Sequence, residues 1–235
     1  MLELRSFANL GRFANDWLNA NYHFSFSGYH DPNRDGWGSL LVWNDDTIRA
    51  KSGFPPHPHR DMEIVTYVRK GAVTHEDSLG NRGRTGAGDV QVMSAGTGIR
   101  HAEYNLEDEA TTLFQIWIHP AEGGVRPRWE MRKFPKADRG GKFVPLASGR
   151  AGHEGAAIIH QDAAVLGAAL KPGDEVVFDV APGRFVYLVP ATGRIAVNGI
   201  EGGARDGFAA RDLDRLTIKA IEESEIVLAD VPPLR

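Results

Sequence analysis

The sequence has 235 residues, of which 42% are hydrophobic and 25% are charged, so it is typical of a folded globular protein with one large domain or two small ones. Its formal net charge of −4 offers no counter-charge for a phosphate backbone, which argues against direct nucleic acid binding. The absence of cysteine excludes disulfides, thiolate nucleophiles, zinc fingers and iron–sulfur clusters, so any bound metal must be held by histidine and carboxylate side chains.

The sequence also bears on location and on membrane contact. Its N-terminal segment, MLELRSFANLGRF, lacks the basic start and the apolar run of a secretory signal. No stretch approaches the ~18 consecutive apolar residues of a membrane-spanning helix. We therefore expect a cytoplasmic protein with no membrane partner, and a monomer as the default oligomeric state.

Short segments rich in Val, Ile, Phe and Tyr recur between turn residues, and 27 Gly and 13 Pro supply those turns. Regularly spaced short strands predict an all-β fold, either a sandwich or a barrel. Candidate helices are few: residues 9–21 could contain one short turn, and residues 161–170 are rich in Ala. In chain order, strands are predicted at residues 38–43, 62–68, 88–93, 111–118, 184–189, 194–199 and 224–231.

Residues 120–142 interrupt this rhythm with three prolines and a dense run of charges, which predicts a long connection between two halves. The halves resemble each other weakly, because residues 67–81 and 187–199 each read as a strand, a Gly-containing turn and a second strand. The sequence therefore predicts two tandem β-barrels, with domains at residues 1–135 and 136–235.

Two pairs of residues carry the clearest chemical signal. His57 and His59 stand two apart in PPHPHRDME, and His101 and Glu103 stand two apart in GTGIRHAEYN. Side chains two apart on a strand point to the same face, so each pair can present its ligands side by side. If the pairs face one another inside a barrel, they form a three-His, one-carboxylate set for a divalent first-row metal with open positions. Taken alone, the His57–His59 pair could equally be surface or core residues; the second pair favours a metal.

These residues resemble the cupin superfamily and, more closely, the pirin family of two-barrel cupins. Pirins supply the carboxylate ligand from the second motif as His-x-Glu, which is the pattern at His101 and Glu103. The sequence departs from the second motif at Ser94, which stands in the place of Pro, and by a two-residue insertion before His101. The resemblance covers nearly all of residues 1–135 and is thinner beyond. The first cupin motif is met by Gly53, His57, His59, Glu63 and Gly71, and the second by Gly88, Gly96, His101 and Asn105.

The resemblance implies two jelly-roll-like cupin barrels, with one metal in the N-terminal barrel and none in the C-terminal barrel. It further implies quercetin 2,3-dioxygenase activity, in which a flavonol ring is cleaved with O2 and carbon monoxide is lost. The implied metal ligands are His57, His59, His101 and Glu103. Fe(II) is the first choice of metal, with Cu, Ni, Mn, Co and Zn as alternatives. Glu103 is also the candidate base that accepts the proton of the substrate hydroxyl.

Alternatives remain open beside this activity. The protein could be a metal- or redox-responsive regulator that docks on another protein with little turnover, or it could catalyse another cupin reaction such as an isomerisation. Among the remaining polar residues, Glu63 is expected to orient a ligand imidazole rather than to bind metal. His75, beside two acidic residues, is expected to be a solvated hairpin residue, and the basic segment around Trp129 a solvated connection.

Overall fold

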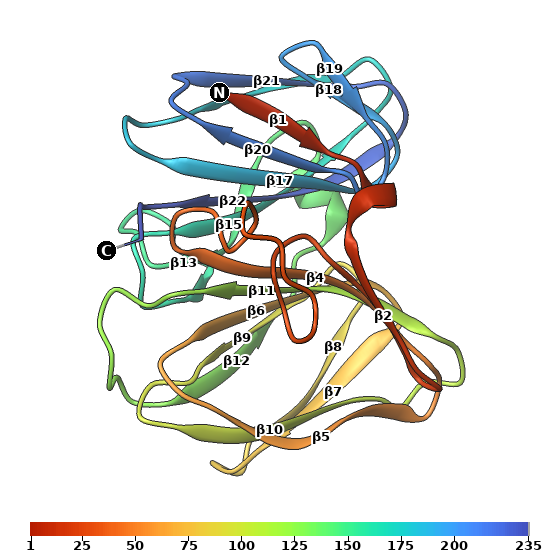
Figure 1. The fold of residues 1–235 in the computed structure, drawn as a ribbon, viewed down its shortest axis with the longest axis vertical. Coiled ribbons are helices and arrows are strands. Elements are labelled where there is room, and N and C mark those ends of the chain that lie inside the picture. The colour runs from red at the N-terminus through yellow and green to blue at the C-terminus, as the bar shows by residue number, and fades with distance from the viewer. Residues whose placement is uncertain (235) are drawn as a thin grey trace.

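The computed structural model describes residues 1–234 and contains two β-barrels stacked one above the other (Figure 1). Each barrel is built from a seven-stranded and a four-stranded sheet, so the predicted all-β, two-barrel fold is confirmed. Within the described residues the only helices are the 3-10 turns η1 (Phe7–Asn9) and η2 (Lys136–Arg139). Neither of these turns has the length or apolar character that crossing a membrane requires.

The N-terminal barrel is formed by antiparallel strands, and most of the paired strands are not consecutive in the sequence. Its seven-stranded sheet has the order β12 (Arg128–Arg132), β9 (Val90–Ser94), β6 (Glu63–Lys70), β11 (Thr111–Ile118), β4 (Leu40–Ile48), β3 (Leu18–Tyr22) and β2 (Gly11–Ala14). Its four-stranded sheet has the order β5 (Ser52–His59), β10 (Ile99–Asn105), β7 (Ala72–Asp77) and β8 (Arg82–Gly86).

The C-terminal barrel has the same two-sheet plan, but one of its strands, β1, comes from the start of the chain. The seven-stranded sheet has the order β1 (Leu2–Arg5), β20 (Gly207–Arg211), β17 (Phe185–Thr192), β22 (Ser224–Val231), β15 (Ala164–Leu170), β13 (Val144–Ser148) and β14 (Ala157–Ile158). The four-stranded sheet has the order β16 (Glu175–Asp179), β21 (Arg215–Ala220), β18 (Ile195–Val197) and β19 (Ile200–Gly202). The predicted division after residue 135 lies between β12 and β13.

Each of the seven predicted strands overlaps an observed strand, whereas the two helix predictions are wrong. The Ala-rich segment contains the strand β15, which lies between β13 and β22, and at Gly167 its neighbours leave no room for a side chain. A Cβ atom on Gly167 would stand 2.8 Å from Arg139 and 2.9 Å from Leu146. Residues 9–21 form the hairpin of β2 and β3, and part of the predicted connection is the strand β12.

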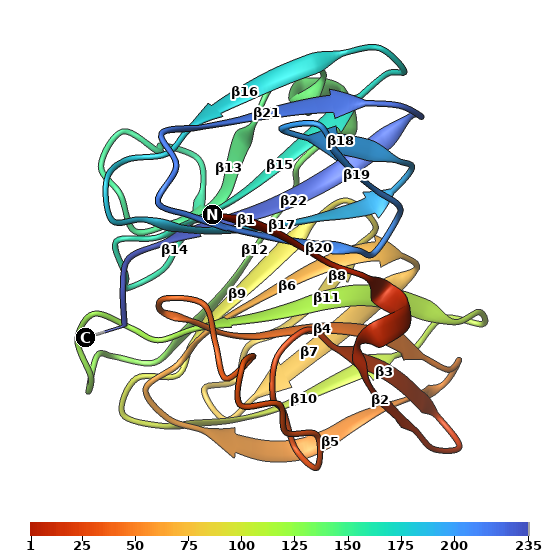
Figure 2. The same cartoon turned by 45° about the horizontal axis from the view of Figure 1, so that its top comes forward.

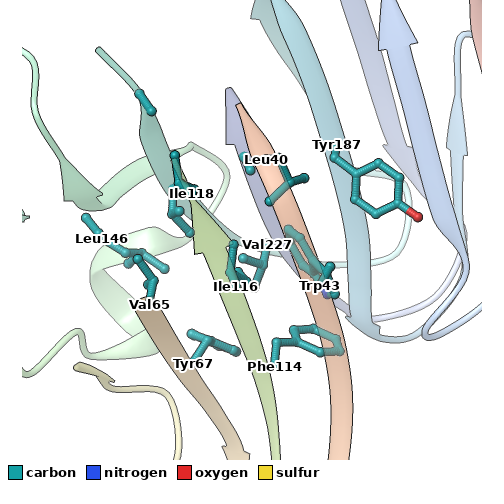
Figure 3. Packing of buried hydrophobic residues seen from close by; sticks show 14 of the residues in the cluster. Leu40, Trp43, Val65, Tyr67, Phe114, Ile116, Ile118, Leu146, Tyr187 and Val227 are labelled. Atoms are coloured by element: carbon teal, nitrogen blue, oxygen red, sulfur yellow. The ribbon is translucent and has the colours of Figure 1, made fainter. Parts of the chain in front are cut away.

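One apolar cluster crosses the contact between the two barrels (Figure 3). The ring of Trp43 on β4 lies 5.5 Å from Phe114 on β11 and 5.6 Å from Tyr187 on β17 of the other barrel. Buried Asp45 adds an ionic contact across the same junction, with Arg205 at 2.5 Å. This packing uses the seven-stranded sheets, and the sheet containing β5 and β10 lies on the far side of the N-terminal barrel (Figures 1 and 2).

Candidate metal centre

The predicted residue pairs lie on two neighbouring antiparallel strands, β5 and β10. His57 is directly opposite His101, and a register shift follows before Glu103. The pairs therefore lie side by side in one sheet. They do not face each other across the barrel, which is the arrangement that the sequence analysis considered. Pro58, between His57 and His59, removes no hydrogen bond needed inside the sheet, because β5 is an edge strand.

The structure brings the three predicted histidines together. Ring nitrogens of His57, His59 and His101 all lie within 4.8 Å of one another. The ring centroids are 4.4 Å apart for His57 and His101 and 4.9 Å apart for each pair that includes His59. His101 is buried, whereas His57 and His59 are half-buried, so the cluster can be reached from the solvent side.

The hydrogen bonds of these rings favour metal binding. His57 Nδ1 lies 2.8 Å from the carbonyl of Pro55 and donates to it, which leaves Nε2 free. His101 Nε2 is buried without any partner, although an unsatisfied buried polar atom is costly. Burial, together with the neighbouring imidazoles, lowers the pKa of His59 to about 4 and that of His101 to about 3. Both rings are thus neutral at pH 7, and the orphaned nitrogen fits a metal ion.

Glu103 is buried nearby, but it is held by other side chains. Its Oε1 accepts hydrogen bonds from Gln91 at 2.5 Å and Thr66 at 3.3 Å, and its Oε2 accepts one from Gln115 at 2.7 Å. Its carboxylate belongs to a second group, with His101 and His75, rather than to the group of three histidines. The sequence analysis missed Gln91 and Gln115; their signal was a polar residue directly flanked by apolar ones on a strand.

His75 is fully buried, so the prediction of a solvated hairpin residue is wrong. Its strand β7 lies between β10 and β8, and Glu103 is directly opposite His75. Its ring lies 2.9 Å from the carboxylate of Asp77 and stacks on Trp129 at 4.8 Å. Trp129 therefore covers the back of the centre and does not belong to a solvated connection.

Glu63 does not orient a ligand imidazole, contrary to the prediction. Ser94 donates a hydrogen bond of 2.7 Å to it, and Nδ1 of His160, from the C-terminal barrel, lies 3.3 Å from its other oxygen. The chain turns at Asp61, where φ is +46°, and passes into the other sheet, so Glu63 does not lie on the strand that carries His57 and His59.

A pocket of about 270 Å³ is connected to the centre through two residues of its wall. Gln115, which binds Glu103, forms part of its wall, and so does Phe54, whose ring lies 6.2 Å from His57. Asn44 and Asp46 on β4 also line it, and each has a buried side-chain oxygen without a hydrogen-bond partner. The aromatic residues of the wall are Phe13, Trp17, Tyr22, Phe26 and Phe54. A larger cavity of about 790 Å³ is lined by residues of η2 and the C-terminal barrel.

Comparison with known proteins gives a family match for each half of the chain. The pirin family model matches residues 4–118, and the model of the quercetinase C-terminal cupin domain matches residues 146–231. A Pseudomonas aeruginosa protein, whose name assigns it provisionally as a quercetin 2,3-dioxygenase, is 58% identical over 98% of this chain and 100% of its own length. An Escherichia coli protein named quercetin 2,3-dioxygenase is 42% identical over the full length of both chains.

The solved structures agree with these sequence relationships. The E. coli pirin YhhW in complex with nickel(II) matches with a TM-score of 0.93 and 41% identity, and the match covers 100% of both chains. The resemblance inferred from the spacing of the histidines is thereby confirmed. The chain belongs to the pirin family.

Proposed function

We propose that this protein is a metal-dependent dioxygenase that cleaves a flavonol-like aromatic compound with O2. The observation that carries the proposal is the cluster of His57, His59 and His101, with a buried His101 nitrogen that lacks a partner, next to an aromatic-lined pocket. The name of the E. coli relative, quercetin 2,3-dioxygenase, supports the same reaction. In this proposal Glu103 is the fourth ligand and Fe(II) the metal, and the C-terminal barrel binds none.

The histidines and Glu103 would have different roles in this reaction. A bound divalent ion would act as a Lewis acid that lowers the pKa of the substrate hydroxyl and, as Fe(II), would supply reducing power toward O2. His57, His59 and His101 hold it as neutral imidazoles. Glu103, fixed by Gln115 and Gln91, accepts the proton released from the substrate hydroxyl.

The pocket beside the centre suits a planar, hydroxylated substrate. Phe26 and Phe54 offer apolar faces on which flat rings can pack and from which water is excluded. The unpartnered oxygens of Asn44 and Asp46 can accept hydrogen bonds from substrate hydroxyl groups. A flavonol has both features, and its 3-hydroxyl beside the 4-carbonyl is the group that loses the proton.

The activity is tested with protein that is stripped of metal, loaded with Fe(II) without oxygen, mixed with quercetin and then exposed to air. We expect quercetin absorbance to decay and carbon monoxide to appear only after O2 is admitted. The His101→Ala variant should show neither. If quercetin is not lost in an O2-dependent way with iron, copper, nickel, manganese or cobalt, the proposed activity is refuted. Bound metal without turnover would favour the alternative, a metal- or redox-responsive regulator that docks on another protein.

The metal ligands are tested separately by elemental analysis. Wild-type protein should carry up to one equivalent of metal, and the double variant His57→Ala, His59→Ala should carry essentially none. A metal content that does not change in the double variant would place the ion elsewhere.

A further inference from the structure

Asp77, His75 and His101 form a buried row that ends in the three-histidine cluster, since His101 belongs to both. The Oδ2 atom of Asp77 lies 2.9 Å from His75 Nε2, and His75 Nδ1 lies 3.4 Å from His101 Nδ1. The side chains of His75 and Asp77 are completely shielded from solvent. These contacts leave only one ring nitrogen of His101 free, and that nitrogen is the orphaned Nε2.

The row fixes where each proton sits. Although burial alone would raise it, hydrogen bonds from His75 and Asn81 hold the pKa of Asp77 below its ordinary value, so its carboxylate is ionised and can only accept. His75 must then carry its proton on Nε2 and present a lone pair at Nδ1. His101 donates to that lone pair from Nδ1, which leaves a lone pair on Nε2.

The surroundings hold this row rigidly. Asp77 Oδ1 accepts hydrogen bonds from the backbone of Leu79 at 2.9 Å and of Asn81 at 3.1 Å. The ring of His75 is stacked on Trp129 with 7° between the planes, which fixes its orientation. Gly83 makes this stacking possible, because a Cβ atom there would come within 2.2 Å of the indole.

We propose that His75 and Asp77 are positioning residues for the metal centre: they fix His101 in the form protonated on Nδ1, with Nε2 as the metal donor, and they make that donor more basic. This inference rests on the proposed metal centre. It also assigns His75 a supporting role, although His75 belongs to a group spaced for metal binding with His101 and Glu103.

The first test needs no metal. In ¹⁵N-labelled, metal-free protein at pH 7, correlation spectra of the imidazole nitrogens should show His101 protonated on Nδ1 and His75 on Nε2. Spectra of the His101→Ala and His75→Gln variants assign the signals. A His101 ring that carries its proton on Nε2 would overturn the proposal, because that nitrogen could not then bind a metal without losing it.

The second test measures affinity for Ni²⁺ by competition with a chelator. His75→Phe keeps the stacking on Trp129 but removes the hydrogen bonds, and it should weaken binding on the order of tenfold, the lower end of the range for partners of metal-bound histidines. His75→Gln can both donate to Asp77 and accept from His101, so it should restore most of the affinity. Asp77→Asn should also bind more weakly, since the charge is lost.

Glu76→Gln is the matched control, because Glu76 lies on the same strand and pairs with Arg82 at the surface. It should bind within about twofold of wild type. Thermal melting of the metal-free variants separates loss of affinity from loss of folding. Equal affinities for His75→Phe and Glu76→Gln would overturn the proposal.

The outcomes also distinguish this inference from the proposed function. A wild-type protein that binds no Ni²⁺ would refute the metal centre and this inference together. A wild-type protein that binds metal but leaves quercetin intact would refute the activity alone. The visible spectrum of bound Co²⁺ should change in His75→Phe and stay the same in Glu76→Gln.

Discussion

His160 of the C-terminal barrel lies beside Glu63 of the N-terminal barrel, with its Nδ1 3.3 Å from a carboxylate oxygen of Glu63. Glu63 is fully buried, and this burial raises its pKa. Besides His160, the hydroxyl of Ser94 is the side chain that hydrogen-bonds the carboxylate. The two barrels therefore meet at a polar contact as well as through their apolar cluster.

Removal of His160 should weaken the contact between the barrels. Because His160 is partly exposed, we expect His160→Ala to lower the free energy of unfolding by only about 1 kcal/mol. In a Glu63→Gln background the same change should cost less, because no buried carboxylate is left without its partner. Urea unfolding of the four proteins measures this coupling. Effects that add within about 0.3 kcal/mol would show that the two side chains do not interact.

Gln115 connects the pocket to Glu103 and should control the rate of the proposed reaction. Gln115→Met keeps a similar volume but cannot donate to the carboxylate, so the turnover of quercetin should fall on the order of tenfold. Trp117 donates to the amide oxygen of Gln115 at 3.2 Å, and Trp117→Phe should have a smaller effect in the same direction. Steady-state kinetics with Fe(II)-loaded protein checks the series. An unchanged kcat in Gln115→Met would show that this hydrogen bond does not position the base.

The histidine cluster could be predicted because its pattern is local. His57 and His59 lie on one strand, and alternation along a strand fixes that they share a face. The same alternation does not extend to Glu63, because a turn at Asp61 sends the chain into another sheet. His75 could not be placed because its contact with His101 joins residues 26 apart in the sequence, and only the pairing of their strands creates it.

The strands were predictable where β-branched and aromatic residues recur, as in β6 and β11. The strand β15 was not, because its Ala-rich sequence has no local preference for a strand. At Gly167 the close approach of Arg139 and Leu146 excludes any side chain. Such a requirement comes from packing between distant segments, and the sequence around β15 does not contain it.

Asp46 should select ligands that carry a hydroxyl group on the ring that enters the pocket. Metal-free wild-type protein should bind quercetin more tightly than galangin, which lacks the hydroxyls on that ring. Asp46→Leu should remove the preference, worth about 1 kcal/mol for one hydrogen bond. Asp16→Asn, at the exposed turn between β2 and β3, is the control. Quenching of tryptophan fluorescence reports binding, and a preference that survives in Asp46→Leu would contradict this role.

His23 should make the fold sensitive to acid. It is completely buried between the barrels, with Nδ1 2.9 Å from the hydroxyl of Tyr187. Burial and then the neighbouring Arg5 lower its pKa from 6.5 to about 3. Below pH 6.5 the His23 side chain therefore binds a proton in the unfolded chain but not in the folded protein. The stability that neutral His23 contributes is fully present above that pH and is lost as the pH falls toward 3.

From pH 6.5 to 4.5 this single group should lower the free energy of unfolding by about 2 kcal/mol, given about 1.4 kcal/mol per pH unit. His23→Gln cannot titrate, so its stability should fall by that much less over the same interval, even if the variant is less stable at pH 7. Both proteins are unfolded with urea in the metal-free state, where the three-histidine cluster affects them equally. Parallel stability curves for the two proteins would mean that folding does not change the pKa of His23, which would contradict this prediction.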